Sequence, residues 1–343
     1  MLSSRHNKNI FLLFLIFFLI VVSLISLSYG QINIPLKNTL ATVLYHLGMW
    51  DGDNAFTKEQ DAVIWFIRMP RVLIGIMVGA GLGISGAVMQ GLFNNPLVDP
   101  GITGVSAGAA AGAVLAIALG WSAENILVMP MFALGGSISA VFLTVFLAMR
   151  RGKIPVMTLL LAGVVVGMLL GAVTAGILTV MNEQKLQSYL FWIIGGLDYR
   201  RWEHVYIAVP PILTGILIML AAARHLNVLA MGETEARAVG MAVLPFRMGI
   251  MLTAAAVTAV SVCVSGNIGF VGLIIPHMMR ILLGPDHRLL LPASALAGAV
   301  FLVGCDLLGR VIIPPAEIRV GIMTALIGAP YFLYLLRRMQ RNF

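Results

Sequence analysis

Few residues in this chain have the types and spacing needed for chemistry, and those few favour ion pairing over catalysis. Asp306 and Arg310 lie four residues apart in an apolar segment. Side chains at this spacing share one helix face, so an ion pair is expected. The five lysines include none in the phosphate-binding pattern G-x-x-x-x-G-K-[ST]. Because there is also no Ser–His–Asp set and no zinc motif, the sequence predicts no catalytic residue, no metal site and no directly bound cofactor.

The elements that must position these residues are apolar. Of the 343 residues, 60% are hydrophobic and 10% charged, whereas a soluble domain carries about a quarter charged residues. Several apolar runs are long enough to cross a hydrocarbon core, which takes roughly 20 helical residues. Backbone groups in lipid must satisfy one another, so these runs are expected to be helices. The sequence therefore predicts an all-α, polytopic membrane protein, and the net charge of +8 gives no reason to expect nucleic acid as a partner.

We expect a single transmembrane domain over residues 1–343 with about ten spans. The first apolar run follows a basic start and could be a signal peptide, but it exceeds the usual core of about 7–15 residues, so an uncleaved span is expected. The piece 189–197 is too short to span and is expected at an interface or as a re-entrant segment. The expected spans are residues 10–28, 71–91, 103–120, 126–149, 156–180, 204–223, 244–264, 269–283, 290–308 and 319–337.

The distribution of charge orients these spans. With the N-terminus in the cytoplasm, 13 of the 22 Lys and Arg fall inside, against 4 of the 14 Asp and Glu. An excess of Lys and Arg marks the cytoplasmic side of a membrane protein. Because ten spans put both ends of the chain on one side, both termini are predicted to be cytoplasmic.

Three expected spans carry a small residue at every fourth position. Residues four apart share a helix face, so each stripe lets a neighbouring backbone approach closely. We therefore expect tight packing among spans two to five, and no repeat at the level of sequence. The stripes are Gly75, Gly79, Gly83, Ala87 and Gly91; Gly104, Gly108, Gly112, Ala116 and Gly120; and Gly163, Gly167, Gly171 and Ala175.

One polar stretch, "NVLAMGETEARAVGM" (227–241), interrupts the apolar chain on the cytoplasmic side. Its acids precede its arginine, which suits the helix dipole, and Glu233 can pair with Arg237. A helix of about seven residues is not stable alone in water, so a packing partner is expected. Ala236 and Val239, three apart, indicate a small docking surface, although a plain connecting turn is the alternative. The residues that define this short helix, 233–239, and its ends are Gly232, Glu233, Glu235, Ala236, Arg237, Val239 and Gly240.

This stretch resembles the cytoplasmic coupling helix of the FecCD family of permeases. "LNVLAMGETEARAVG" (226–240) is similar to the family pattern L-x-x-L-x-L-G-x-x-x-A-x-x-L-G, with Met231 and Val239 as mild changes. Further blocks, at 68–109, 266–299 and 306–338, resemble the family in the same order along the chain. One position departs from it: Arg319 stands in "EIRVG" where the family usually has Pro.

The resemblance implies a permease subunit of an ABC importer for iron–siderophore complexes, heme or cobalamin. Such a subunit lies in the inner (plasma) membrane with a second permease subunit, either an identical copy or a paralogue. Two cytoplasmic ABC ATPases use the ATP, and a substrate-binding protein delivers the cargo from outside. The 233–239 helix would then couple ATP hydrolysis in the ATPase to movement of the permease.

The resemblance also gives a role to arginines on the outer side. Acidic residues of the binding protein are expected to dock onto Arg68 and Arg71, in the R-x-P-R motif, and onto Arg310. Arginine suits this contact because its planar fork binds a carboxylate through two hydrogen bonds. The alternatives are that Arg68 and Arg71 only anchor a span at the headgroups and that Arg310 only pairs with Asp306. Arg319 adds a positive charge on the same side, with no role assigned.

Among cargoes, a ferric siderophore is expected first, with heme or cobalamin as the alternative. The alternative from another class is an ATP-independent secondary carrier. Such a carrier would need ionisable residues buried in several spans, and this chain lacks them. The importer permease is therefore the favoured hypothesis.

Overall fold

The computed structural model describes residues 5–50, 55–149 and 156–340, and every regular element in these ranges is a helix. Arg150, Arg151, Lys153 and Arg341, counted above on the cytoplasmic side, lie outside the described residues. The helices are α1 (Arg5–Ser28), α2 (Leu36–His46), α3 (Lys58–Asp61), α4 (Met69–Leu92), α5 (Val105–Ala118), α6 (Val128–Ala148), α7 (Val156–Thr179), α8 (Glu183–Ile194), α9 (Trp202–Ala221), α10 (Ala223–Ala230), α11 (Glu233–Ala238), α12 (Val243–Ser265), α13 (Val271–Leu283), α14 (His287–Val311) and α15 (Val320–Gln340), with a π-helical stretch Ala62–Arg68 and short 3-10 helices Pro100–Thr103 and Trp121–Ala123.

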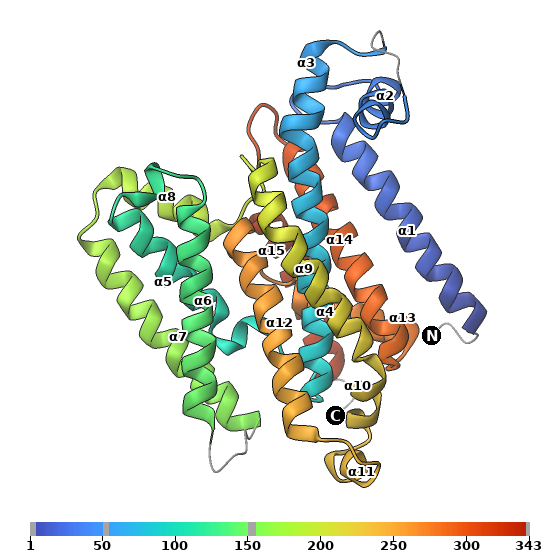
Figure 1. Cartoon of the computed structure of the whole chain (residues 1–343), viewed down its shortest axis with the longest axis vertical. Coiled ribbons are helices and arrows are strands. Elements are labelled where there is room, and N and C mark those ends of the chain that lie inside the picture. The colour runs from blue at the N-terminus through green and yellow to red at the C-terminus, as the bar shows by residue number, and fades with distance from the viewer. Residues whose placement is uncertain (1–4, 51–54, 150–155, 341–343) are drawn as a thin grey trace.

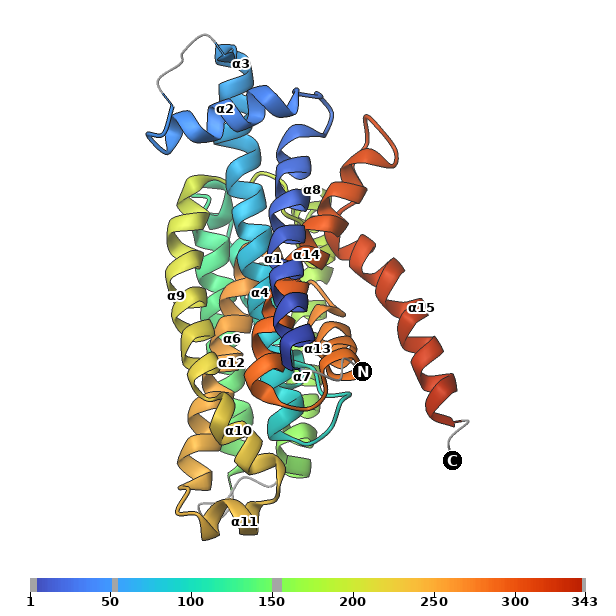
Figure 2. The same ribbon diagram turned by 90° about the vertical axis from the view of Figure 1, so that its right-hand side faces the viewer.

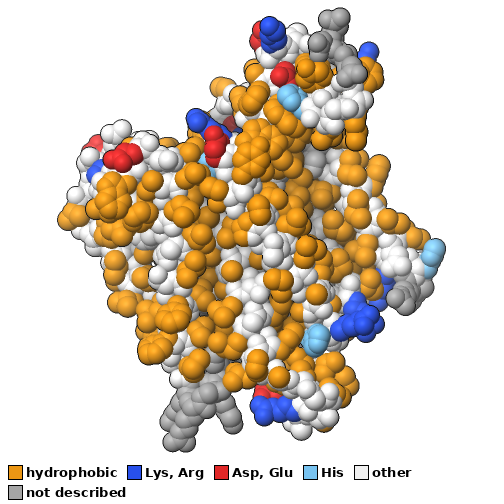
Figure 3. Space-filling model, in the orientation of Figure 1, with side chains coloured by type: hydrophobic (Ala, Val, Ile, Leu, Met, Phe, Trp, Pro, Cys, Tyr) orange, Lys and Arg blue, Asp and Glu red, His pale blue; other side chains and the backbone are white. Residues whose placement is uncertain are grey.

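In the described ranges, seven helices are long and apolar enough to cross a membrane. Three shorter apolar helices, Val105–Ala118, Val271–Leu283 and Val320–Tyr334, fall where further spans were expected. The predicted all-α, polytopic membrane fold is confirmed. Figure 1 shows α2 and α3 at one end of the bundle and α11 at the other, with both ends of the chain toward α11. On the face drawn in Figure 3, hydrophobic side chains form a broad belt and charged ones gather near the two ends.

The second span is longer than the sequence suggested. A continuous helix runs over Lys58–Leu92 and passes through the π-helical stretch Ala62–Arg68. Pro70, at the start of α4, would clash with a carbonyl one turn earlier in a regular α-helix. A π-helical turn is wider and lies directly before this proline. The sequence predicts a start at residue 71, directly after Pro70. The helix instead continues through Pro70, because the π-helical stretch before it accommodates the proline ring.

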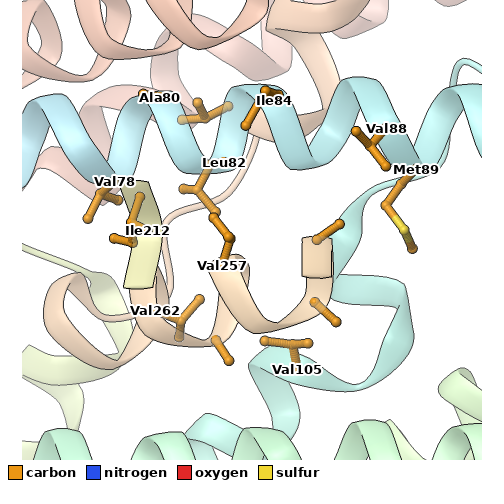
Figure 4. Close-up of a cluster of buried hydrophobic side chains, with 14 of the residues drawn as sticks. Val78, Ala80, Leu82, Ile84, Val88, Met89, Val105, Ile212, Val257 and Val262 are labelled. Atoms are coloured by element: carbon orange, nitrogen blue, oxygen red, sulfur yellow. The ribbon is translucent and has the colours of Figure 1, made fainter. Parts of the chain in front are cut away.

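Helix α4 is the centre of the fold. Its side chains are buried along most of its length, and it packs against α14, α12, α9 and α13. Figure 4 shows Leu82 of α4 pointing toward Val257 of α12, with Ile212 of α9 beside them. A helix that is apolar on all sides, as α4 is, requires partners on all sides. The α4 helix thereby joins the early and late spans into one bundle.

The glycine stripes of α4 and α5 both pack closely on another helix, the α5 stripe on an expected partner and the α4 stripe on a different one. A Cβ atom on Gly79 would lie 2.4 Å from the carbonyl oxygen of Gly298 in α14, and one on Gly108 would lie 2.3 Å from that of Gly136 in α6. The α4 stripe therefore contacts the ninth span, so the expected tight packing among spans two to five holds for the α5 stripe but not for the α4 stripe. On α7, Gly171 has no non-local atom within 4 Å of a Cβ position, so among the described residues that part of its stripe meets no other helix.

The polar stretch of the sequence forms two helices, α10 and α11. Gly232 separates them with a φ of 134°, a backbone conformation open to glycine. The short piece expected at an interface contributes to α8, at the outer end of the bundle in Figure 1. Figure 2 shows that α15 leaves the bundle toward its C-terminal end.

Candidate functional site

The inner candidate site is α11, which an exposed ion-pair cluster holds in place. Glu233 accepts a 2.6 Å hydrogen bond from Arg237 within the helix and lies 3.4 Å from Arg247 of α12. The hydrogen bond from Arg237 is the main cause of the lowered pKa of Glu233, and the charge of Arg247 adds to it. The expected pair of Glu233 and Arg237 is therefore present, and its carboxylate also ties α11 to α12.

The exposed surface of α11 differs from the one expected. Ala236 is fully buried, at 0% exposure, so the expectation that it shares an exposed face with Val239 is wrong. The helix ends at Ala238, and Val239 already lies in the turn that follows, where the helical period no longer applies. The two large apolar side chains that are exposed there are Met231, at 74%, and Val239, at 71%.

A recess lies beside this surface. It has a volume of about 460 Å³ and is lined by Val228, Val239, Pro245 and Phe246 among others. Gly240, with a φ of 84°, turns the chain at its edge. Val239 lines this recess, and exposed Met231 lies just before the short helix α11. Together they form an apolar surface suited to a protein partner. Glu235 is also exposed on α11.

The outer candidate site centres on Arg71, which three carboxylates surround. Its guanidinium donates to Asp306 at 2.9 and 3.0 Å and to Glu317 at 2.9 Å, and it lies 3.2 Å from Asp198. The carboxylate of Asp306 also lies 3.2 Å from Arg310, the pair expected from their spacing. Arg71 and Asp198 line an open cavity of about 670 Å³ at this end of the molecule.

Arg68 and Arg310 hold the outer end of α1. Arg68 donates to the carbonyl oxygens of Leu27 and Ser28 at 2.7 and 2.9 Å, and also to that of Ile32. Arg310 donates to the carbonyls of Ser26 and Tyr29 at 3.1 and 3.2 Å, and to the hydroxyl of Ser26. The last turn of a helix has carbonyls without intrahelical donors and favours cations. The two buried arginines supply the missing donors and the positive charge. Their guanidiniums therefore face into the protein.

Arg319 has a clear structural place in the outer cavity. Its guanidinium stacks over the ring of Phe191, with Cζ 4.6 Å from the centroid, and donates to the Phe191 carbonyl at 2.8 Å. It also lies 3.5 Å from Asp198. Nearby, burial lowers the pKa of Arg200 to about 10, against the opposing charge of Asp198. Arg201, in contrast, is exposed.

Sequence reasoning missed several residues of these sites. Asp198 and Glu317 complete the carboxylate set around Arg71, and both lie in short connections between apolar segments. Met231 was noted only as a mild change to a pattern, although it is exposed beside α11. A search for charges that flank the outer ends of spans would have found the two acids.

The bundle has an apolar surface suited to a protein partner at its inner end and an open charged cavity at its outer end. This arrangement is typical of a membrane transport subunit. The family model described as the FecCD transport family matches residues 18–338. The chain therefore belongs to the FecCD family of permeases.

Named relatives agree with this family. The chain is 48% identical over 280 residues to the cobalamin import system permease protein BtuC of Halobacterium salinarum. The alignment covers 82% of this chain and 74% of that protein. It is 35% identical over 346 residues to the hemin transport system permease protein HmuU of Yersinia pestis, covering 99% of each. It also matches a solved structure described as an inward-facing conformation of a metal-chelate type ABC transporter, with a TM-score of 0.83, 32% identity, and coverage of 96% of this chain and 99% of that one.

The chain is thus a membrane-embedded permease subunit of an ABC importer of the FecCD type. Subunits of this kind are not themselves enzymes, and they work with an ATPase and a binding protein. The relatives named here differ in cargo, cobalamin in one and hemin in the other.

Proposed function

We propose that this chain carries a metal chelate inward across the inner (plasma) membrane, driven by ATP hydrolysis in a separate cytoplasmic ATPase. The observation that carries the proposal is the exposed apolar surface around α11, at the inner end of a bundle that has its charged cavity at the other end. Work done by a partner at α11 can reach the bundle because Ala236 is buried and Glu233 pairs with Arg247 of α12. No chemistry in this chain is required.

Cobalamin is the cargo that we propose to test first. The relative with 48% identity is a cobalamin permease by name, whereas the hemin permease is 35% identical. A ferric siderophore, the expectation from the resemblance, is the second candidate, because one matching solved structure is described as a transporter of the metal-chelate type. Both cargoes are bulky complexes of a chelated metal.

Coupling to the ATPase is assigned to α11 and its two ends. Met231 and Val239 would enter the partner's surface, while Glu235 and Arg237 lie exposed around them. The remaining residues of the site shape the helix: Gly232 and Gly240 turn the chain at its ends, Glu233 braces it on α12, and Ala236 anchors it in the core.

Docking of the external binding protein is assigned to the outer cavity around Arg71. Tyr199 and Arg201 are exposed at its edge and are available to a partner. Arg68 and Arg310 would support this surface by holding α1 beside it. A direct contact of either one with an acidic partner would require its guanidinium to leave the α1 carbonyls.

A second permease subunit, identical or paralogous, is proposed to pack against α15. This helix diverges from the bundle in Figure 2 and forms one side of a groove of about 520 Å³ with Ile194. Gly321, Ala325 and Ala329 line the groove, and such small residues allow close helix packing in membranes. Oxidative crosslinking of an Ala329→Cys variant would test this contact. The unchanged chain is the control, because both of its cysteines are buried.

The deciding experiment is uptake into proteoliposomes that contain this permease, its ATPase and its binding protein. Cyanocobalamin, ferrichrome and hemin are compared side by side, with and without ATP inside. We expect ATP-dependent uptake of cyanocobalamin above the other two. If only ferrichrome were taken up, the proposed cargo would be wrong and the proposed mechanism would stand. ATP-independent uptake by the permease without its ATPase would overturn the proposal.

A further inference from the structure

Arg280, near the end of α13, has no partner for its charge. The side chain is partly shielded, and within residues 5–50, 55–149 and 156–340 neither a carboxylate nor a hydrogen-bond acceptor pairs with it. It is close enough to His277 and His287 for its charge to act on both imidazoles. A shielded cation without a partner loses hydration and gains nothing in return, which makes Arg280 a candidate to bind an anion.

Other basic groups lie at the same corner. Lys8 of α1 donates to the carbonyl oxygen of Leu283 at 2.6 Å, and its Nζ would lie 3.9 Å from a Cβ on Gly284. Figures 1 and 2 both place the start of α1 beside α13, and Figure 3 shows Lys and Arg side chains gathered there. The corner formed by the start of α1 and the end of α13, here called the inner basic corner, therefore carries at least the two positive charges of Lys8 and Arg280.

The acid nearest in sequence does not neutralise this corner. Asp286 accepts a 2.6 Å hydrogen bond from Asn227 of α10 and a 3.0 Å bond from the backbone of Arg288 at the start of α14. Although burial alone would raise its pKa, these bonds lower it. Asp286 is therefore ionised but directed toward α10 and its own helix cap, and Arg280 stays free for another anion.

The surroundings of Arg280 indicate what kind of anion fits. The next two residues, Ile281 and Leu282, are exposed apolar side chains, at the end of an apolar helix and on the side of the molecule where α11 lies. A cation beside exposed apolar side chains at a membrane boundary matches a lipid, with its phosphate on the cation and its chains on the apolar side chains. A purely acidic protein surface would leave Ile281 and Leu282 unmatched.

We infer that the inner basic corner binds the phosphate of an anionic phospholipid of the inner leaflet, with Arg280 as the direct contact. Arginine suits a phosphate because its planar fork donates two parallel hydrogen bonds. The bound lipid would link the start of α1 to the end of α13 through its contacts at this corner. This inference does not depend on the cargo or on the residues assigned to α11.

The test measures lipid binding to the full chain, purified in detergent, by native mass spectrometry. The probes are palmitoyl-oleoyl phosphatidylglycerol, palmitoyl-oleoyl phosphatidylcholine and inorganic phosphate. We expect the unchanged chain to prefer phosphatidylglycerol, and Arg280→Gln to weaken that binding by about five- to tenfold. Lys58→Gln is the control, because it removes one exposed positive charge at the other end of the molecule and should leave binding unchanged.

Arg280→Lys keeps the charge but not the planar fork, so it should retain most of the preference for phosphatidylglycerol. If Arg280→Gln does not fold, lipid binding by the Lys variant still tests the site. The inference would be overturned by binding of Arg280→Gln within twofold of the unchanged chain, by an equal loss in Lys58→Gln, or by displacement of the lipid by equimolar inorganic phosphate. Loss of ATPase association in Arg280→Gln with lipid binding intact would instead identify an acidic protein partner, and would also overturn it.

Discussion

The outer and inner ends of this permease use charge in opposite ways. At the outer end, Arg71, Arg310 and Asp306 are buried or nearly so, and their charges are satisfied within the protein. At the inner end, Glu233 and Arg237 pair on the surface of α11, and the large exposed side chains beside them, Met231 and Val239, are apolar. Charge therefore holds the outer end together, whereas the inner end leaves apolar surface around α11 available to a partner.

The largest expected effect comes from breaking the outer charge cluster. Asp306→Asn leaves Arg71 and Arg310 without the carboxylate that they share, in a site where Asp306 is 3% exposed. Loss of one partner from a buried ion cluster costs about 3–5 kcal/mol. Thermal unfolding in detergent should show a clear drop in midpoint. Glu203→Gln, an exposed acid at the same end, should change it little, and an equal drop in both variants would contradict the comparison.

The next effect concerns the attachment of α1. Arg68→Met keeps much of the side-chain volume but removes the donors to Leu27 and Ser28, at an expected cost of about 1–3 kcal/mol. Hydrogen exchange should quicken at the amides of Tyr29 and Ile34, which bond to Ile25 and Ser28.

The matched control for that variant is Arg201→Met, which changes an exposed arginine of the outer end. It should leave exchange at the end of α1 unchanged while weakening association with the binding protein. If Arg68→Met weakened that association without changing exchange, Arg68 would contact the partner directly, as the resemblance implied.

At the inner end the expected effect is on coupling and hardly on folding. Met231→Asp with Val239→Asp alters side chains that are 74% and 71% exposed, so the free energy of unfolding should change by no more than about 0.5 kcal/mol per site. Cargo transported per ATP hydrolysed should fall about tenfold, since charge replaces a desolvated apolar contact of roughly 1.4 kcal/mol or more. Uptake and ATP hydrolysis are measured in the same proteoliposomes.

Leu47→Asp with Met49→Asp provides the control for the coupling variant. These side chains are 57% and 73% exposed at the outer end, so the chemical change is the same on the opposite side of the membrane. Normal transport per ATP in the inner variant, or an equal loss in this control, would refute the assignment of coupling to α11.

The smallest expected effect is that of the exposed ion pair. Glu233→Gln should cost no more than about 0.5 kcal/mol, because surface pairs are screened by solvent. The pKa of Glu233 is lowered in the folded chain from its ordinary 4.5, so its contribution is present above that value and lost as pH falls through the lowered pKa. The difference in midpoint between the unchanged chain and this variant should therefore be constant at neutral pH and vanish in acid.

Local spacing predicted some contacts correctly and could not predict others. The pairs Asp306–Arg310 and Glu233–Arg237 are both present, because residues four apart on a helix are neighbours whatever surrounds them. The prediction that Ala236 and Val239 share a helix face was wrong because α11 ends before Val239. The roles of α11 in coupling and of the outer arginines in docking stay predictions.

Hydropathy and the charge pattern alone determined that this is an all-α protein of many membrane spans, because the need to satisfy backbone groups in lipid acts on each segment separately. Only the tertiary structure decided which polar groups are free to meet a partner. Arg68 reads in the sequence as an exposed docking residue, yet it caps carbonyls 40 and 41 positions away, and Arg280 reads as one more cytoplasmic arginine, yet it has no partner among the described residues. Beyond neighbours on one helix, whether a charge is satisfied depends on atoms that folding brings close, and the spacing of residues along the chain does not predict those contacts.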